Sequence, residues 1–107
     1  MTEAGIYTRF YLNDLAREVH DIAVSKGFYE NPKSFIEAVY LIADECHEAG
    51  REFITKHDEN IPEELADVLI RLLDTWTYYC PGSDIDAVIR AKMDKNKTRP
   101  KLHGKRL

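Results

Sequence analysis

Apolar residues recur every three to four positions along most of the chain, which is the spacing of one face of an α-helix. The first such run covers Leu12–Lys26 and stops at Gly27, a residue suited to the position after a helix. A second run begins with Asn31 as N-cap and Pro32 at the first helical position, and it continues to about Lys56. The pattern therefore predicts two helices in the first half of the chain.

Two more helices are predicted in the second half. Pro62 opens the third, and Cys80-Pro81-Gly82 ends it. Ser83 is expected to cap the fourth, with Asp86 completing a capping box, and this helix is expected to fray before Pro100. No segment alternates with period two for long enough to indicate a strand. We predict an all-α fold, a bundle of four to five helices that forms one domain over residues 1–107.

The apolar positions of the two central helices predict which sides are buried. The second helix carries a stripe formed by Phe35, Ile36, Val39, Ile42, Ala43 and Cys46. The third carries a broader one formed by Leu65, Val68, Leu69, Leu72, Leu73 and Trp76. The third helix is apolar over more than the stripe that one surface helix needs, so a second buried face and a homo-oligomer are expected.

Length and composition place the chain among small globular proteins. It has 107 residues and no apolar stretch of the roughly 18 residues that a membrane span needs. The start, Met1-Thr2-Glu3-Ala4-Gly5, lacks the basic and apolar parts of a signal peptide, so a cytoplasmic location and no membrane partner are expected. The two cysteines, Cys46 and Cys80, form no CxxC pair and are expected to be reduced thiols.

Charge is distributed unevenly along the chain. Residues 1–89 hold 18 acidic and 7 basic side chains, a balance of −11, whereas residues 90–107 hold 8 basic side chains and one acidic, a balance of +7. The overall charge of −4 argues against a dedicated nucleic-acid binder, whose affinity rests on neutralising phosphates. An acidic body with a basic tail suits a site that holds metal at one end and phosphate at the other.

Two pairs of carboxylates carry the most specific chemical signal. Glu45 and Glu48 lie three residues apart on the second predicted helix, and Glu64 and Asp67 have the same spacing on the third. Residues with this spacing are neighbours on a helix surface, so four acids converge if the two helices pack antiparallel. Crowded carboxylates resist ionisation unless a cation neutralises them, and Mg²⁺ prefers oxygen ligands. A magnesium site is one reading, and two ordinary solvated helix faces are the other.

Other chemistries find less support. His47 lies beside the first pair, but oxygen-rich magnesium sites rarely use nitrogen ligands. A di-iron carboxylate bundle needs a Glu-x-x-His pair on each of two helices, and neither acidic pair is followed by such a histidine. Near the C-terminus, Lys92, Asn96 and Arg99 recur at helical spacing and would share a face that can clamp phosphate oxygens. An ordinary basic helix end is the alternative.

Taken in order, these motifs resemble the MazG-like nucleotide pyrophosphohydrolases of the all-α NTP pyrophosphatase superfamily. That family has E-E-x-x-E, then E-x-x-D, then K-x-x-x-N-x-x-R-P followed by H-G-K. The chain shows Asp44-Glu45-x-x-Glu48, Glu64-x-x-Asp67, Lys92-x-x-x-Asn96-x-x-Arg99-Pro100 and His103-Gly104-Lys105. The resemblance covers roughly the last 60% of the chain, from Asp44 to Arg106. It departs from the family at Asp44, where relatives often have glutamate.

The resemblance implies a Mg²⁺-dependent enzyme, with Mn²⁺ as a possible substitute, that hydrolyses the α–β phosphoanhydride of a nucleoside triphosphate in nucleotide-pool housecleaning. It implies that Glu45, Glu48, Glu64 and Asp67 bind metal and act in catalysis, with Asp44 or Glu63 orienting the attacking water. Lys92, Asn96 and Arg99 would hold the phosphates, and the protein would be a homodimer or homotetramer. The alternatives are another nucleotide substrate, such as phosphoribosyl-ATP, and a non-catalytic helical domain for oligomerisation or partner binding.

Overall fold

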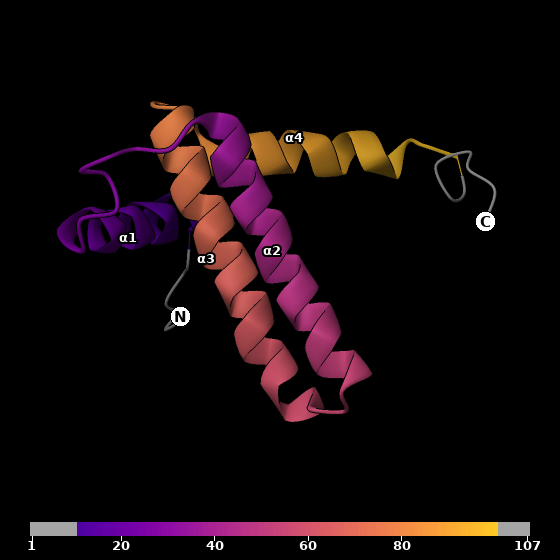
Figure 1. Cartoon of the computed structure of the whole chain (residues 1–107). Coiled ribbons are helices and arrows are strands. Elements are labelled where there is room, and N and C mark those ends of the chain that lie inside the picture. Colours follow the sequence, from indigo (N-terminus) through magenta and orange to yellow (C-terminus); the bar gives the residue numbers. More distant parts are fainter. Residues whose placement is uncertain (1–10, 101–107) are drawn as a thin grey trace, which may run out of the picture.

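The computed structural model describes residues 11–100, which fold as an all-helical chain (Figure 1). Four α-helices follow in order: α1 (Leu12–Ser25), α2 (Phe35–Ile54), α3 (Ile61–Tyr79) and α4 (Ile85–Lys97). A short 3₁₀ turn, Asp58–Asn60, joins α2 to α3. Within this range there is no strand, so the predicted all-α fold class is confirmed.

Helices α2 and α3 form an antiparallel hairpin (Figure 1). The buried residues of α2 are Ala38 and Ala49, whose small side chains allow a neighbouring helix to come close. Pro62 lies in the first turn of α3, as predicted, because its missing N–H is one that a helix start leaves unpaired anyway. The antiparallel arrangement is the condition under which the two acidic pairs can meet.

A small core forms where α1 packs on α3 and the start of α4. Ala16 of α1, Leu73 of α3 and Ile85 of α4 are buried together. Leu12, Leu15, Trp76 and Ile89 are partly buried around them. This core therefore fixes α1 against the C-terminal half of α3, beside the hairpin rather than within it.

The start of α2 differs from the prediction. Asn31 and Pro32 do not begin the helix; Ser34 is its N-cap. The Ser34 side chain accepts a hydrogen bond from the Glu37 N–H at 3.2 Å, and the Glu37 carboxylate accepts one from the Ser34 N–H at 3.0 Å. These two hydrogen bonds satisfy the backbone N–H groups of Ser34 and Glu37. A helix start at Asn31 and Pro32 would not provide this reciprocal pair. The backbone hydrogen bond of Ser34 is the main cause that lowers the pKa of Glu37.

The predicted capping box of α4 is also wrong. Asp84, not Ser83, is the N-cap, and its carboxylate accepts a hydrogen bond from the Ala87 N–H at 3.0 Å. The Ser83 hydroxyl instead accepts a hydrogen bond from the Trp76 indole at 3.0 Å. A partly buried indole N–H needs an acceptor, and Ser83 supplies it. Ser83 therefore ties the turn before α4 to α3.

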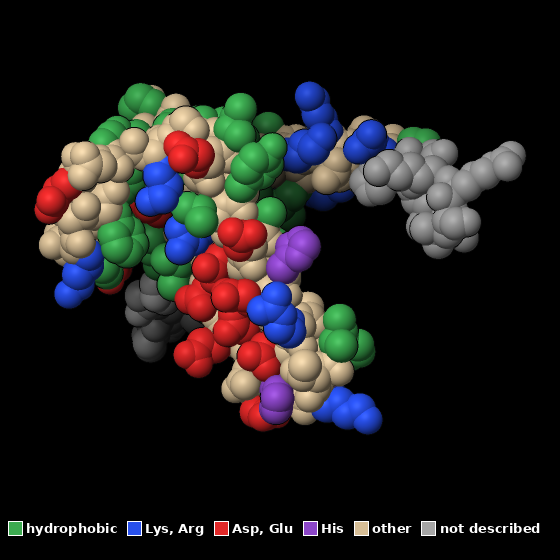
Figure 2. All heavy atoms as spheres, in the orientation of Figure 1, with side chains coloured by type: hydrophobic (Ala, Val, Ile, Leu, Met, Phe, Trp, Pro, Cys, Tyr) green, Lys and Arg blue, Asp and Glu red, His purple; other side chains and the backbone are tan. Residues whose placement is uncertain are grey.

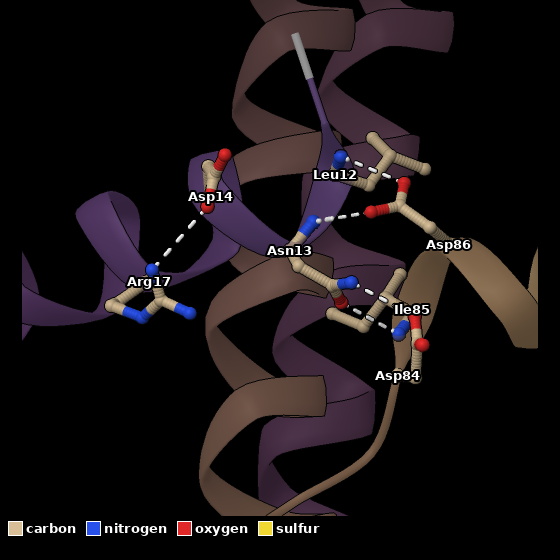
Figure 3. A network of polar contacts seen from close by, with 7 residues as sticks. All are labelled: Leu12, Asn13, Asp14, Arg17, Asp84, Ile85 and Asp86. Atoms are coloured by element: carbon tan, nitrogen blue, oxygen red, sulfur yellow. Dashed lines mark hydrogen bonds and ion pairs between the residues drawn. The ribbon is translucent and has the colours of Figure 1, made fainter.

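Asp86 caps α1 rather than its own helix (Figure 3). Its carboxylate accepts hydrogen bonds from the backbone N–H of Leu12 at 2.9 Å and of Asn13 at 3.3 Å. The Asn13 side chain donates to Asp84 at 2.8 Å and accepts from the Ile85 N–H at 2.7 Å. The bond from Asn13 is the main cause that lowers the pKa of Asp84. Together these contacts join the N-termini of α1 and α4.

We predict that Asp86→Ala destabilises the fold by about 1 kcal/mol, the usual cost of losing a helix N-cap. The change removes the acceptor for two backbone donors of α1. Urea unfolding measures the effect. Asp94→Ala is the matched control, because Asp94 forms only an exposed ion pair with Lys97, and such pairs contribute little. Equal stability of the two variants would contradict the capping role.

The predicted apolar stripe of α2 is not buried within one chain. Phe35, Ile36, Val39, Ala43 and Cys46 are exposed, and Ile42 is only half buried. On α3, Leu65, Leu69 and Leu72 are likewise exposed. The narrow alanine side of α2 meets α3 instead, which turns the larger apolar side chains outward.

Helix α4 points away from α1 and extends beyond the hairpin (Figure 1). The radius of gyration, 16.8 Å, exceeds the roughly 13 Å of a compact chain of about 100 residues. The four helices of a single chain therefore do not close into a compact bundle. None of the helices between residues 11 and 100 is both long and apolar enough to cross a membrane.

Candidate metal centre

The antiparallel hairpin brings three predicted acidic residues together. Glu45 and Glu48 of α2 and Glu64 of α3 each place one carboxylate oxygen within 4.8 Å of the other two. Asp67, one turn along α3, lines the same cleft. Figure 2 shows acidic side chains gathered over the hairpin on this face. The two i, i+3 spacings produce this arrangement because each pair lies on the side of its helix that faces the cleft.

The carboxylates line an open cleft of about 420 Å³ between α1, α2 and α3. Its polar lining consists of Glu45, Glu48, Glu64, Asp67, Arg71, Asp74 and Lys26. Its apolar lining consists of Val19, Ile22, Ala23, Phe28 and Ile70. A cleft of this size, apolar in one part and charged in another, suits a ligand with one apolar and one charged end.

Glu64 is the most perturbed acid of the cluster. Its Oε2 atom is buried and has no hydrogen-bond partner. Burial, followed by the charges of Glu48, Asp67, Glu52 and Glu45, raises the pKa of Glu64 above its ordinary 4.5. An unpartnered carboxylate oxygen among other carboxylates is unfavourable, and a bound cation removes both problems. The donors are all oxygens, so the residues fit a hard divalent ion such as Mg²⁺.

The raised pKa of Glu64 predicts a pH-dependent cost in the metal-free protein. The folded state holds this proton more tightly than the unfolded state, so the stability falls as pH rises from the ordinary value of 4.5 through the folded-state pKa. Glutamine mimics the protonated side chain. In chelator, Glu64→Gln should therefore be more stable than wild type at about pH 7.5, with a smaller difference at about pH 4.5. Denaturant unfolding at both pH values measures this.

The matched control is Glu63→Gln, which changes an exposed residue in the same first turn of α3. Both variants remove a negative charge near the helix N-terminus, where such charge is favourable, so this contribution cancels in the comparison. If Glu64→Gln were no more stable than Glu63→Gln at the higher pH, the repulsion at Glu64 would be absent.

Three charged residues of the cleft were not predicted from the sequence. Arg71 lies one turn beyond Asp67 on α3, and its Nε atom is 3.5 Å from Oε1 of Glu45 on α2. Asp74 follows one turn later, and Lys26 comes from the end of α1. Extending the Glu64-x-x-Asp67 pattern along the same helix face would have reached Arg71 and Asp74, at seven and ten residues from Glu64. No comparable signal pointed to Lys26.

Asp74 also anchors a polar network behind the cleft. It forms a hydrogen bond with Nδ1 of His20 at 2.8 Å and accepts another from the Tyr29 hydroxyl at 2.8 Å. Burial, with help from this bond, raises the pKa of Tyr29, so its hydroxyl stays a donor. Tyr29 stacks on Tyr78 with ring centroids 4.3 Å apart. These contacts tie α1, the following turn and α3 together at one end of the cleft.

Several predicted site residues lie elsewhere. Asp44 and Glu63 are exposed and do not line the cleft. Lys92, Asn96 and Arg99 are exposed at the far end of the chain, on or just beyond α4, which leads away from the acidic cluster of its own chain (Figure 1). The predicted His103-Gly104-Lys105 motif lies outside the described residues.

Comparison with known families agrees with this geometry. The family model described as the MazG nucleotide pyrophosphohydrolase domain matches residues 33–103, which include α2, α3 and α4. Comparisons with curated proteins and with solved structures gave no match. Helix α1, which supplies one wall of the cleft, precedes the matched region. Because the match spans about two thirds of the sequence and contains both acidic pairs, the chain belongs to the MazG nucleotide pyrophosphohydrolase family.

Proposed function

We propose that the chain is a Mg²⁺-dependent hydrolase, with Mn²⁺ as a possible substitute, that converts a nucleoside or deoxynucleoside triphosphate to the monophosphate and pyrophosphate. The observation that carries this proposal is the set of three converging carboxylates, with the unpartnered Glu64 oxygen among them, in the cleft. We place the activity in the cytoplasm, in the removal of unwanted nucleotides.

Glu45, Glu48, Glu64 and Asp67 would hold the metal. A bound divalent ion would neutralise charge on the phosphates and lower the pKa of an attacking water. The chain's own residues then position the substrate. Phosphates would lie at the carboxylate end, while the base and sugar would lie against Val19, Ile22, Ala23, Phe28 and Ile70. Asp44 and Glu63 stay proposals for orienting the water, and both would have to approach the cleft to do so.

The reaction forms a bond from the water oxygen to the α-phosphorus and breaks the bridge to the β-phosphorus, with one proton released. We expect equal amounts of monophosphate and pyrophosphate from a screen of ordinary, deoxy and modified triphosphates with Mg²⁺. In ¹⁸O-labelled water the label should enter the monophosphate. A diphosphate with free phosphate would place the cleavage at the β–γ bridge. Label in the pyrophosphate would place the attack of water on the β-phosphorus instead of the α-phosphorus. Including phosphoribosyl-ATP in the screen tests the alternative substrate.

A second copy of the chain is part of the proposal. The exposed apolar side chains of α2 and α3, such as Phe35, Leu65 and Leu69, form a surface that water disfavours. Lys92 and Asn96 lie on a helix that leads away from the acids of their own chain. We therefore propose a homodimer or homotetramer in which α4 brings these residues to the cleft of a neighbouring chain.

A purely structural role for the domain is less consistent with the cleft. A hairpin used only for assembly has no need of Glu64, whose buried oxygen lacks a partner and whose neighbours Glu48 and Asp67 raise its pKa. Such groups are unfavourable for folding and are typical of functional sites. Absence of turnover over the whole substrate screen would nevertheless favour the structural role.

A further inference from the structure

Arg71 is the one described cation that pairs with the acidic cluster. Helix α3 places Glu64, Asp67 and Arg71 on one face at spacings of three and four residues. The Arg71 Nε atom is 3.5 Å from Oε1 of Glu45, which lies across the hairpin on α2. The side chain of Glu45 is 17% exposed and that of Arg71 is 37% exposed. The pair therefore joins a largely buried carboxylate to a cation that reaches solvent.

The contact between Arg71 and Glu45 is loose. Its 3.5 Å separation exceeds the roughly 2.7–2.9 Å of a tight charge-assisted hydrogen bond. Between residues 11 and 100, no hydrogen bond involves the Arg71 guanidinium. A guanidinium carries five N–H donors in a planar fork that matches phosphate oxygens. Arg71, which lines the cleft beside the carboxylates, therefore has donors that no described side chain occupies.

A metal ion and Arg71 would compete for the same carboxylate. If Glu45 binds a divalent ion, its negative charge is no longer available to Arg71, and the two cations repel each other. Asp74, one turn further along α3, is already bonded to His20 and Tyr29. The phosphates of a nucleotide then become the largest negative charge open to Arg71 in the cleft. Lys26, which also lines the cleft, lies at the end of α1 and pairs with none of the described acids.

We infer that Arg71 is a switching cation: it neutralises Glu45 in the metal-free cleft and turns to the polyphosphate when metal and nucleotide bind. This inference rests on the proposed function, because it requires a phosphate ligand. It assigns to Arg71 a phosphate contact that the sequence analysis predicted only for residues on or just beyond α4. It also explains why one arginine lies among side chains that otherwise form a cation site.

The test uses Arg71→Gln, Arg71→Lys and the control Arg17→Gln, which removes an exposed arginine paired only with Asp14. Calorimetric titration gives the affinity for Mn²⁺ alone and, at saturating Mg²⁺, for α,β-methylene triphosphate analogues. We expect Arg71→Gln to bind Mn²⁺ about tenfold more tightly, since one repelling charge is gone. It should bind the analogues about 100-fold more weakly, and its kcat/KM should fall by about 100- to 1,000-fold.

Arg71→Lys should keep the metal affinity of wild type and show an intermediate loss of analogue affinity, because it keeps the charge without the fork. It also replaces Arg71→Gln as the test if the latter loses helical content. Weaker binding of both metal and analogue by Arg71→Gln would mean that Arg71 only holds Glu45 in place, which overturns the inference. The inference would also be overturned if Arg71→Gln behaved like the control Arg17→Gln in both titrations. If wild type neither binds nor hydrolyses nucleotides, the proposed function fails, and the Mn²⁺ titration alone still decides whether Arg71 competes for Glu45.

Discussion

Replacing Glu48 with glutamine is expected to lower nucleotide turnover by about 1,000-fold or more, because it would remove one of the charged oxygen ligands of the proposed metal ion. Glu48 shares the cluster with Glu45 and Glu64, where three carboxylate oxygens lie within 4.8 Å of one another. Its side chain is exposed on α2, so the helical content should not change. Initial rates at saturating Mg²⁺ and far-ultraviolet circular dichroism measure the two effects. Asp67→Asn should behave similarly.

The same variant should lose its thermal response to metal. Wild type should melt at a higher temperature in Mg²⁺, because the ion binds only the folded state and relieves the repulsion around Glu64. Glu48→Gln should show little of this shift. The control is Glu59→Gln, the same chemical change at an exposed site on the 3₁₀ turn, which should keep both activity and the metal response. Full activity of wild type in excess chelator would contradict the metal-dependent mechanism.

The acidic cluster could be proposed from the sequence because its geometry depends mainly on local rules. A spacing of three residues puts Glu45 beside Glu48, and Glu64 beside Asp67, whatever the rest of the fold does. Only one non-local condition was needed, an antiparallel hairpin, and the short turn between the helices favours it. Helix type was predictable for the same reason, since apolar periodicity acts within a single element.

The ends of the helices were harder to predict, because several residues compete to cap them. Asn31 and Ser34 are both good N-cap residues, and the reciprocal bonds between Ser34 and Glu37 decide in favour of the later start. Asp86 had a plausible local role at the start of α4. The Asp86 carboxylate instead accepts a hydrogen bond from the backbone N–H of Leu12, 74 positions away in the sequence. A local pattern carries no information about such a distant partner.

The wall of the cleft formed by α1 could not be predicted either. Which face of an amphipathic helix meets which neighbour depends on packing between elements distant in sequence, such as Ala16, Leu73 and Ile85. The contact between His20 and Asp74 joins residues 54 positions apart, and no spacing rule connects them. The direction of α4 depends on the junction around Asn13 and Asp84, so the sequence could place its basic residues on one face but not relative to the acids.

Lys92→Ala is expected to lower kcat/KM by roughly 10- to 1,000-fold, the scale of losing one or two charge-assisted hydrogen bonds to phosphate. Lys92 and Asn96 lie about one helical turn apart on α4, and Arg99 follows just beyond it, so they can reach a single polyphosphate. Arg99→Ala should cost less, because Arg99 lies beyond the end of the helix. The control is Lys97→Ala, since Lys97 lies outside the face of α4 that Lys92 and Asn96 share and pairs with Asp94.

Helix α4 leads away from the acidic cleft of its own chain. A chain that lacks the basic residues of α4 should therefore regain activity when a neighbouring chain supplies them. Chains with Glu48→Gln and chains with Lys92→Ala plus Asn96→Ala are each expected to be nearly inactive. Coexpressed, they should form mixed dimers in which one of the two clefts has both intact acids and intact basic residues, giving about a quarter of wild-type activity.

Light scattering must then show a multiple of the 12.4 kDa chain. A monomeric mass would exclude this arrangement, and near-normal kinetics of the Lys92→Ala, Asn96→Ala double variant would make the stretch an ordinary basic helix end.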